Sequence, residues 1–250
     1  MKTEWDYTGL AKAYIKRPEY SKEALQQFYQ LSSLHLGSRI CDVGAGVAHL
    51  TLELLSEGFT VDAVEPNDDM RHYGVIRTQS WENVTWYDGV GEATGRESGV
   101  YDAVTFGSSF NVCDQQKALL EAKRLLKPKG WIALLWNHRD LNDPVQNAIE
   151  EIIKSNVSDY SYGKRREDQT EIIEQSGLYE GVHFISGSVT HRLSKEDLIE
   201  AWRSHATLAR QAKDNFIDVI KLIEEYVNSL EESEIIVPYT TRMWVAQSKG

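Results

Sequence analysis

The feature that most constrains the fold of this chain is a regular alternation of short apolar strands and helices between residues 37 and 140. Strand patterns occur at 39–43, 59–64, 83–87, 101–106 and 131–136, and helical patterns end at Gly58 and cover 67–79 and 114–126. Such alternation predicts βαβ units and a mostly parallel sheet. The segment 131–136 is apolar at every position, which is typical of a central strand covered on both faces.

The pattern changes after Asp140. Helical spacing returns at 143–156, 169–176, 195–210 and 213–230, and strand patterns occur at 181–192 and 235–247. Tyr160 and Tyr162 fall in a polar segment, 158–168. They are either aromatic residues of a lid or surface tyrosines of a mobile loop, and the second interpretation is favoured. The fold class predicted is α/β, doubly wound, with a mostly parallel seven-stranded sheet, a reversed C-terminal strand and helical lid insertions.

The 250 residues are expected to form one domain. Its parts are an N-terminal helical cover at 1–36, with a helix at 21–35, a cofactor-binding core at 37–140, and helical insertions at 141–180 and 194–230 that form a lid. No internal repeat and no low-complexity linker divides the chain.

Charge and composition disfavour several classes of partner. The formal net charge is −11, which opposes binding to phosphate backbones, so no nucleic-acid partner is expected. The longest apolar run, 131–136, is too short to span a bilayer, and the first residues lack the apolar core of a signal peptide. Two cysteines are too few for a disulfide framework, and the seven histidines are scattered, so no metal site is expected. We expect a cytoplasmic protein without a membrane partner.

A glycine-containing turn follows the first strand of the core, in the segment Asp42-Val-Gly44-Ala-Gly46. Glycines there let the backbone approach a ligand at the N-terminus of the next helix. The dinucleotide pattern would place a third glycine at position 49, where this chain has His49, and Asp42 would repel a pyrophosphate but suits a cationic ligand. Glu65 ends the next strand and could accept both hydroxyls of a ribose in either cofactor class.

Five motifs then occur in order across about 30–140. They are the turn just described, then 61–67 (Val-Asp-Ala-Val-Glu-Pro-Asn), 89–93 (Gly-Val-Gly-Glu-Ala), 101–111, which begins Tyr-Asp-Ala-Val-Thr-Phe, and 125–131 (Leu-Leu-Lys-Pro-Lys-Gly-Trp). With them, the sequence resembles the class I, seven-stranded S-adenosylmethionine-dependent methyltransferases. The leader, with Tyr7, Tyr14 and Arg17, and the late segment 202–205 resemble a small-molecule branch similar to trans-aconitate methyltransferases. One departure is Ala48, where the family usually has a third glycine; alanine is small enough for close helix–strand packing.

The resemblance implies S-adenosyl-L-methionine as cofactor, with S-adenosyl-L-homocysteine as product. Gly44 and Gly46 would line the methionine part, Glu65 would bind the ribose, Asn67 and Met70 would flank the adenine, and Tyr14 and Arg17 could close over the carboxylate. The full set of cofactor-binding residues expected is Tyr14, Arg17, Asp42, Gly44, Ala45, Gly46, Glu65, Pro66, Asn67, Met70, Gly91, Glu92, Phe106, Gly107 and Ser108.

Residues for the methyl acceptor are expected on loops at the carboxyl ends of the strands and on the late helix. Tyr7, Asn111, Asn137, Arg139, Trp202 and Arg203 are the candidates for substrate binding, and His138, His205 and Asn111 those for catalysis. The helix at 195–210 is expected to cover the acceptor, with Trp202 stacked on it and His205 hydrogen-bonded to it.

The activity expected is methyl transfer by in-line displacement to an oxygen or nitrogen atom of a small molecule, in a monomer or homodimer. Two alternatives stay open: an NAD-dependent oxidoreductase, and a non-catalytic S-adenosylmethionine-binding protein.

Overall fold

The computed structural model describes residues 11–250, except the side chains of residues 164 and 165. Seven strands form one sheet in the order β3-β2-β1-β4-β5-β7-β6. Their bounds are β1 Arg39–Val43, β2 Thr60–Val64, β3 Val84–Tyr87, β4 Tyr101–Gly107, β5 Leu126–Arg139, β6 Tyr179–Ser194 and β7 Glu234–Ser248. Strands β1 to β5 pair in parallel, and β7 is antiparallel to both of its neighbours. The predicted fold class, with a reversed last strand, is confirmed.

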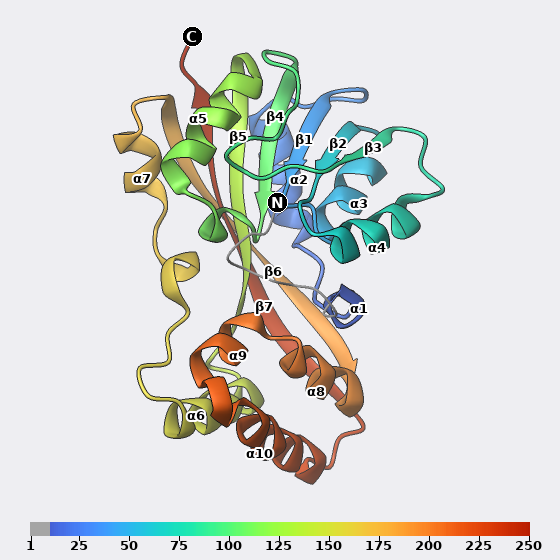
Figure 1. Cartoon of the computed structure of the whole chain (residues 1–250), viewed down its shortest axis with the longest axis vertical. Helices are drawn as coiled ribbons and strands as arrows, with labels where there is room; N and C mark the ends of the chain where they lie inside the picture. The colour runs from blue at the N-terminus through green and yellow to red at the C-terminus, as the bar shows by residue number, and fades with distance from the viewer. Residues whose placement is uncertain (1–10) are drawn as a thin grey trace.

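Helices cover both faces of the sheet and also build a separate lobe below it (Figure 1). On the two faces lie α2 Lys22–Leu31, α3 His49–Ser56, α4 Asp68–Thr78, α5 Gln115–Leu125 and α7 Thr170–Gln175. The lower lobe contains α6 Pro144–Asn156, α8 Lys195–Arg203, α9 Ala206–Ala212 and α10 Phe216–Ser229, and we call it the lid. The short α1, Ala11–Tyr14, and the turns η1 Phe110–Val112, η2 Gly163–Arg166 and η3 Lys213–Asn215 complete the described elements.

Capping residues explain where several helices begin. The side chains of Ser21, Asn67, Asp114 and Asp143 each accept a hydrogen bond from a backbone N–H in the first turn of the helix that follows. Such caps satisfy donors that the helix itself cannot pair. These helices therefore start within one or two residues of the predicted positions.

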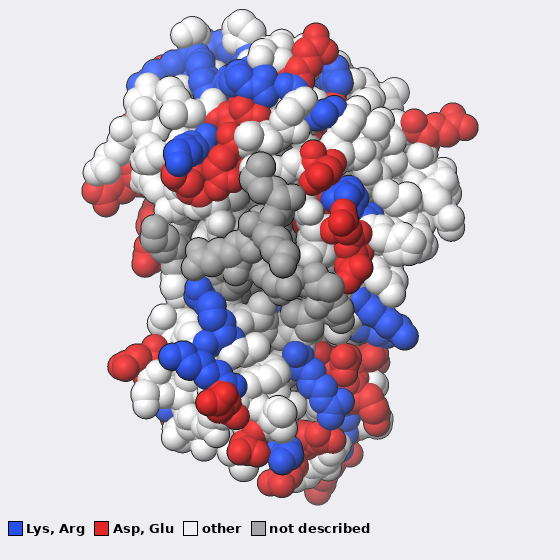
Figure 2. All heavy atoms as spheres, viewed as in Figure 1, with Lys and Arg blue, Asp and Glu red and all other residues white. Residues whose placement is uncertain are grey.

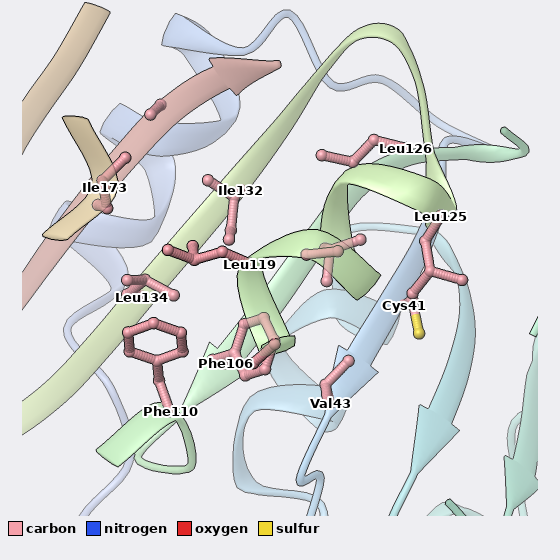
Figure 3. Packing of buried hydrophobic residues seen from close by; sticks show 14 of the residues in the cluster. Cys41, Val43, Phe106, Phe110, Leu119, Leu125, Leu126, Ile132, Leu134 and Ile173 are labelled. Carbon is pink, nitrogen blue, oxygen red and sulfur yellow. The ribbon is translucent and has the colours of Figure 1, made fainter. Parts of the chain in front are cut away.

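One apolar core lies between the sheet and α5. Figure 3 shows Phe106 of β4 and Phe110 of η1 beside each other beneath the helix that carries Leu119. The two rings meet edge to face, with centroids 5.4 Å apart. Full burial of Phe106 in this core fixes the end of β4, which reaches the edge of the sheet where ligands bind in open α/β folds.

The lid has its own apolar core, which packs around the far ends of the last two strands. Ile149, Leu198, Trp202 and Ile223 from three helices of the lid belong to this cluster, together with Val237 of β7. Strands β5, β6 and β7 contain 14, 16 and 15 residues and run from the sheet into the lid (Figure 1). The sheet and the lid are thus built on the same strands.

The structure divides the predicted helix 195–210 into two. Helix α8 ends at Arg203 and α9 begins at Ala206, with Ser204 and His205 between them. The Nδ1 atom of His205 accepts a hydrogen bond from the backbone N–H of Leu208, which makes His205 the N-cap of α9. None of the helices in residues 11–250 has the length and apolar character needed to cross a lipid bilayer.

Candidate active site

A cavity of about 400 Å³ lies where the carboxyl ends of the parallel strands face the lid and the leader. This volume is in the range of sites for small molecules. The predicted site residues that line it are Tyr14, Arg17, Asp42, Gly44, Ala45, Gly46, Glu65, Pro66, Asn67, Met70, Gly91, Glu92, Gly107, Ser108, Asn111, Asn137, His138, Arg139 and His205. The fold therefore brings most of the candidate residues to one cavity.

The turn between β1 and α3 forms the floor of the cavity at its core end. Gly44 and Gly46 have φ values of +71° and +56°, a backbone region that favours glycine. A Cβ on Gly44 would lie 2.3 Å from the Cβ of Ser109. The turn and the loop after β4 are therefore in direct contact, and Gly44 tolerates no side chain.

Glu65 links the ends of β1 and β2 from within the cavity wall. One carboxylate oxygen accepts from the backbone N–H of Gly46 and the other from that of Asn67, each at 2.9 Å. Burial raises the pKa of this carboxyl to about 7, although both backbone hydrogen bonds lower it. A carboxylate oxygen has more than one acceptor position, so both oxygens can still accept a ligand hydroxyl.

Asp42 lies fully buried behind the glycine turn and also borders the cavity. Its carboxylate accepts from the hydroxyls of Thr51 and Thr105, at 2.7 and 2.9 Å. Burial raises the pKa of Asp42 to about 6, against the effect of the two hydroxyls. Asp42 and Glu65 give the core end of the cavity an acidic character.

The leader, residues 11–20, connects the core and the lid along one side of the cavity. An imidazole nitrogen of His49 lies 3.0 Å from the carbonyl oxygen of Tyr14, and a guanidinium N–H of Arg17 donates to the carbonyl of Ser204 at 3.3 Å. The Asn137 amide donates to the carbonyl of Glu19 at 2.8 Å and accepts from Thr241 at 2.6 Å. Asn137 thus holds the leader in place with its own amide group.

The three catalytic candidates meet in the cavity but differ in what they can do. His138, expected on a loop, lies within β5, where it pairs with Thr240 of β7, and it is buried. The Oδ1 atom of Asn111 accepts from the indole N–H of Trp136 at 2.8 Å, which orients its amide. Because Nδ1 of His205 accepts the capping hydrogen bond, its neutral ring carries the proton on Nε2 and can donate there rather than act as a base.

Among the described residues, three of those predicted for the site do not line the cavity. The side chain of Trp202 is 1% exposed and packs against His205, with ring centroids 5.0 Å apart. Arg203 is exposed and pairs with Glu200 and Glu224. The ring of Phe106 lies in the core of the sheet (Figure 3), and Tyr7 lies outside the described residues. Trp202 supports the cavity from behind instead of facing it.

Several residues of the cavity wall were missed by the sequence analysis. Tyr20, whose hydroxyl is 2.9 Å from that of Ser108, is one; others are His49, Arg166 and His191. The interpretation of Tyr162 as a surface tyrosine is wrong, because Tyr162 lines the cavity and donates to Glu150. Arg166 and Tyr162 come from an aperiodic polar segment, which gives no signal of burial.

Comparison with known proteins agrees with this architecture. Residues 41–134, from β1 into β5, match the family described as "Methyltransferase domain". An uncharacterized methyltransferase of Mycobacterium tuberculosis is 32% identical over 124 residues, which are 50% of this chain and 48% of the relative. One of Schizosaccharomyces pombe is 30% identical over 138 residues, 55% of this chain and 54% of the relative. The chain thus matches about half the length of these relatives.

Solved structures share the fold over most of the chain. Phosphoethanolamine N-methyltransferase 2 of Haemonchus contortus, solved with phosphomonomethylethanolamine and S-adenosylhomocysteine, has a TM-score of 0.57 at 17% identity and covers 98% of this chain and 58% of that chain. The YcgJ protein of Bacillus subtilis has a TM-score of 0.57 at 16% identity, covering 91% and 99%. These structures, at 16% and 17% identity, share the fold of this chain, and the match to the methyltransferase family lies within residues 41–134.

Proposed function

We propose that this chain is an S-adenosylmethionine-dependent methyltransferase that methylates an oxygen or nitrogen atom of a small-molecule acceptor. The observation that carries the proposal is the single cavity, in which the glycine turn and Glu65 occupy one end and His138 and the lid the other. Two reactants held in one enclosed space can react without first meeting in solution.

The residues of the core end fit the cofactor. Glu65 would accept the ribose hydroxyls with a carboxylate already oriented by Gly46 and Asn67. The buried carboxylate of Asp42 favours the positive charge of an ammonium or sulfonium group at the glycine turn. When bound, the cofactor supplies a methyl group on a positively charged sulfur, which is already activated for displacement.

The residues of the other end would align the acceptor and move one proton. His138 is the candidate base: it would take the proton from the acceptor atom as that atom forms its bond to the methyl carbon on the side opposite the sulfur. His205 would donate a hydrogen bond from Nε2, and the amide of Asn111, held by Trp136, would orient the acceptor. The protein mainly supplies alignment and exclusion of water.

The proposal includes a small acceptor, a cytoplasmic protein and a monomer or homodimer. On the face drawn in Figure 2, Lys and Arg side chains are interspersed with Asp and Glu, a distribution that favours a small molecule over a nucleic-acid backbone. The branch similar to trans-aconitate methyltransferases is supported by the leader, where Tyr14 and Arg17 line the cavity.

Calorimetry with S-adenosylhomocysteine and with NADH tests the cofactor. We expect the first to bind and the second not to bind, because Asp42 opposes a pyrophosphate at the turn. Glu65→Ala is expected to weaken the binding of S-adenosylhomocysteine by about 1–3 kcal/mol, since the ribose hydroxyls lose a charged acceptor. Gly46→Val is expected to weaken it more, because valine rarely adopts the φ of +56° found there. Undiminished binding in both variants would contradict the assignment of the site.

The acceptor itself can be found by incubating the protein with S-adenosylmethionine and a cell extract. Mass spectrometry then searches for a product heavier by one methylene group that forms only with the protein present. A protein that binds S-adenosylhomocysteine but yields no such product would fit the non-catalytic alternative.

A further inference from the structure

The cavity has two ends of opposite charge. The acidic residues of its wall, Asp42, Glu65 and Glu92, all come from the core, at or just after the ends of strands. The arginines of its wall, Arg17, Arg139 and Arg166, come from the leader, the end of β5 and the turn η2. A cationic ligand group is therefore favoured at the core end and an anionic group at the lid end.

Arg139 and Arg166 are stacked on aromatic rings and have no carboxylate partner among the described residues. The Cζ atom of Arg139 is 4.0 Å from the ring centroid of Trp202, and that of Arg166 is 3.6 Å from the ring centroid of Tyr162. Neither guanidinium forms a salt bridge with an acidic group in residues 11–250, and Nε of Arg139 is buried without a hydrogen-bond partner among them. Stacking of this kind fixes the plane of a guanidinium and leaves its N–H donors directed at a ligand.

The positive charge of Arg139 also acts on Arg166. Burial lowers the pKa of Arg166 and the charge of Arg139 lowers it further, whereas Tyr162 and Glu150 raise it. Glu150 is already engaged, since it accepts from the hydroxyl of Tyr162 and pairs with Lys154 at 3.3 Å. An anion between the guanidiniums would relieve the repulsion of the two positive charges.

Two other basic side chains of the wall, Arg17 and Lys16, already make polar contacts. Arg17 donates to the carbonyl of Ser204 at 3.3 Å and lies over the ring of Tyr14 at 4.3 Å, although its Nε is also buried without a hydrogen-bond partner among the described residues. Lys16 pairs with Asp197 at 3.3 Å. The pair formed by Arg139 and Arg166 is thus the strongest candidate for an anion site at the lid end.

We propose that the acceptor carries a carboxylate or phosphate group that Arg139 and Arg166 bind at the lid end of the cavity. This inference rests on the proposed function. The anion is a handle and not the atom that receives the methyl group, because guanidinium hydrogen bonds occupy its lone pairs and reduce its nucleophilicity. A second group on the same molecule, a hydroxyl or an amine, is the nucleophile and faces the core end.

The test uses malonate and inorganic phosphate as probes and malonamide as the neutral match for malonate. Binding to the protein saturated with S-adenosylhomocysteine is measured by ligand-detected nuclear magnetic resonance. We expect at least one of the two anions to bind and malonamide not to bind. Arg139→Gln and Arg166→Gln are each expected to lower the affinity for that anion at least tenfold. Binding of malonate would indicate an acceptor with a carboxylate group, and binding of phosphate an acceptor with a phosphate group.

Arg192→Gln is the control, because Arg192 is exposed and pairs with Glu234 outside the cavity. It removes the same charge and should leave anion binding unchanged. Equal weakening by all three variants, or no binding of either anion to the unaltered protein, would overturn the inference.

Binding of S-adenosylhomocysteine is measured on each variant as a separate readout and should not change. Loss of that binding in the unaltered protein would contradict the proposed function, not the anion site. Because Arg139 packs on Trp202, thermal unfolding is recorded for each variant as well. If Arg139→Gln does not fold, Arg166→Gln decides the outcome alone, since Arg166 is only half-buried. Unchanged anion binding in Arg166→Gln then overturns the inference.

Discussion

Ala48 has a φ of +74° at the N-terminus of α3, a left-handed conformation that alanine rarely adopts. The alanine side chain is accommodated, as close helix–strand packing requires, since Ala48 is fully buried. The backbone, however, carries a cost that glycine would avoid.

Replacement of Ala48 by glycine is therefore expected to stabilise the protein, by about 0.5–1 kcal/mol, because the relief of backbone strain exceeds the added flexibility of the unfolded chain. Chemical denaturation measures this change. Ala45→Gly is the matched control: Ala45 is in the same turn without a positive φ, and its replacement should destabilise by about 0.4–1 kcal/mol. A loss of stability in both variants would show that the strain at Ala48 is not significant.

In the lid, the apolar pattern of residues 195–210 predicts burial correctly but does not predict which way each side chain points. Trp202 and His205, both expected to contact the acceptor, are buried. The helical spacing continues through residues 204 and 205, so it could not reveal that α8 ends at Arg203 and that His205 caps α9. Trp202 consequently points into the apolar core of the lid, and only His205 reaches the cavity.

For this reason Trp202→Ala should act first on stability. Loss of a fully buried indole that contacts His205 and Arg139 is expected to lower the free energy of unfolding by about 3–5 kcal/mol. Trp81→Ala, at a tryptophan that is 36% exposed, should cost much less. Denaturation curves for the two variants test the difference. If Trp202→Ala instead kept its stability and lost only turnover, direct stacking on the acceptor would be the better explanation.

Much of the core site could be predicted from sequence, because it depends on short motifs at strand ends. The segment at 42–46 and Glu65 lie where the alternation of strands and helices required them to be. Arg166 and Tyr162 could not be found in this way, since they come from a polar segment without periodicity and reach the cavity only through the packing of the lid. Local patterns predict elements, and long-range contacts decide which polar residues face inward.

The whole protein should respond to pH through Glu65 and Asp42. Their pKa values are raised from 4.5 to about 7 and from 3.8 to about 6, so between these values the folded state binds more protons than the unfolded state. The contribution of these two groups to stability is therefore present at low pH and is lost as the pH rises through 6 and 7. Without ligand, this contribution makes the protein more stable at pH 6 than at pH 8.

Cofactor affinity should have the opposite dependence, because the ionised carboxylates bind the ligand. S-adenosylhomocysteine is expected to bind about tenfold more weakly at pH 6 than at pH 8, as Glu65 becomes protonated. Calorimetry across this range measures the change, and Glu65→Gln, which cannot titrate at that position, should reduce it. An affinity independent of pH would mean that Glu65 does not bind the ribose in its ionised form.

Strands β5 and β7 remain paired from Trp131 and Gln247, in the sheet, to Arg139 and Tyr239, at the cavity. A lid joined by a flexible linker can rotate as a separate body. The lid of this protein is attached through the continuous backbone hydrogen bonds of β5 and β7, so it can move only if these paired strands bend. The leader is held against the core and the lid by side-chain contacts to carbonyl oxygens, so we expect ligands to enter and leave by displacement of the leader. The sheet and the lid thus behave as one body, and the leader, residues 11–20, is the segment expected to move.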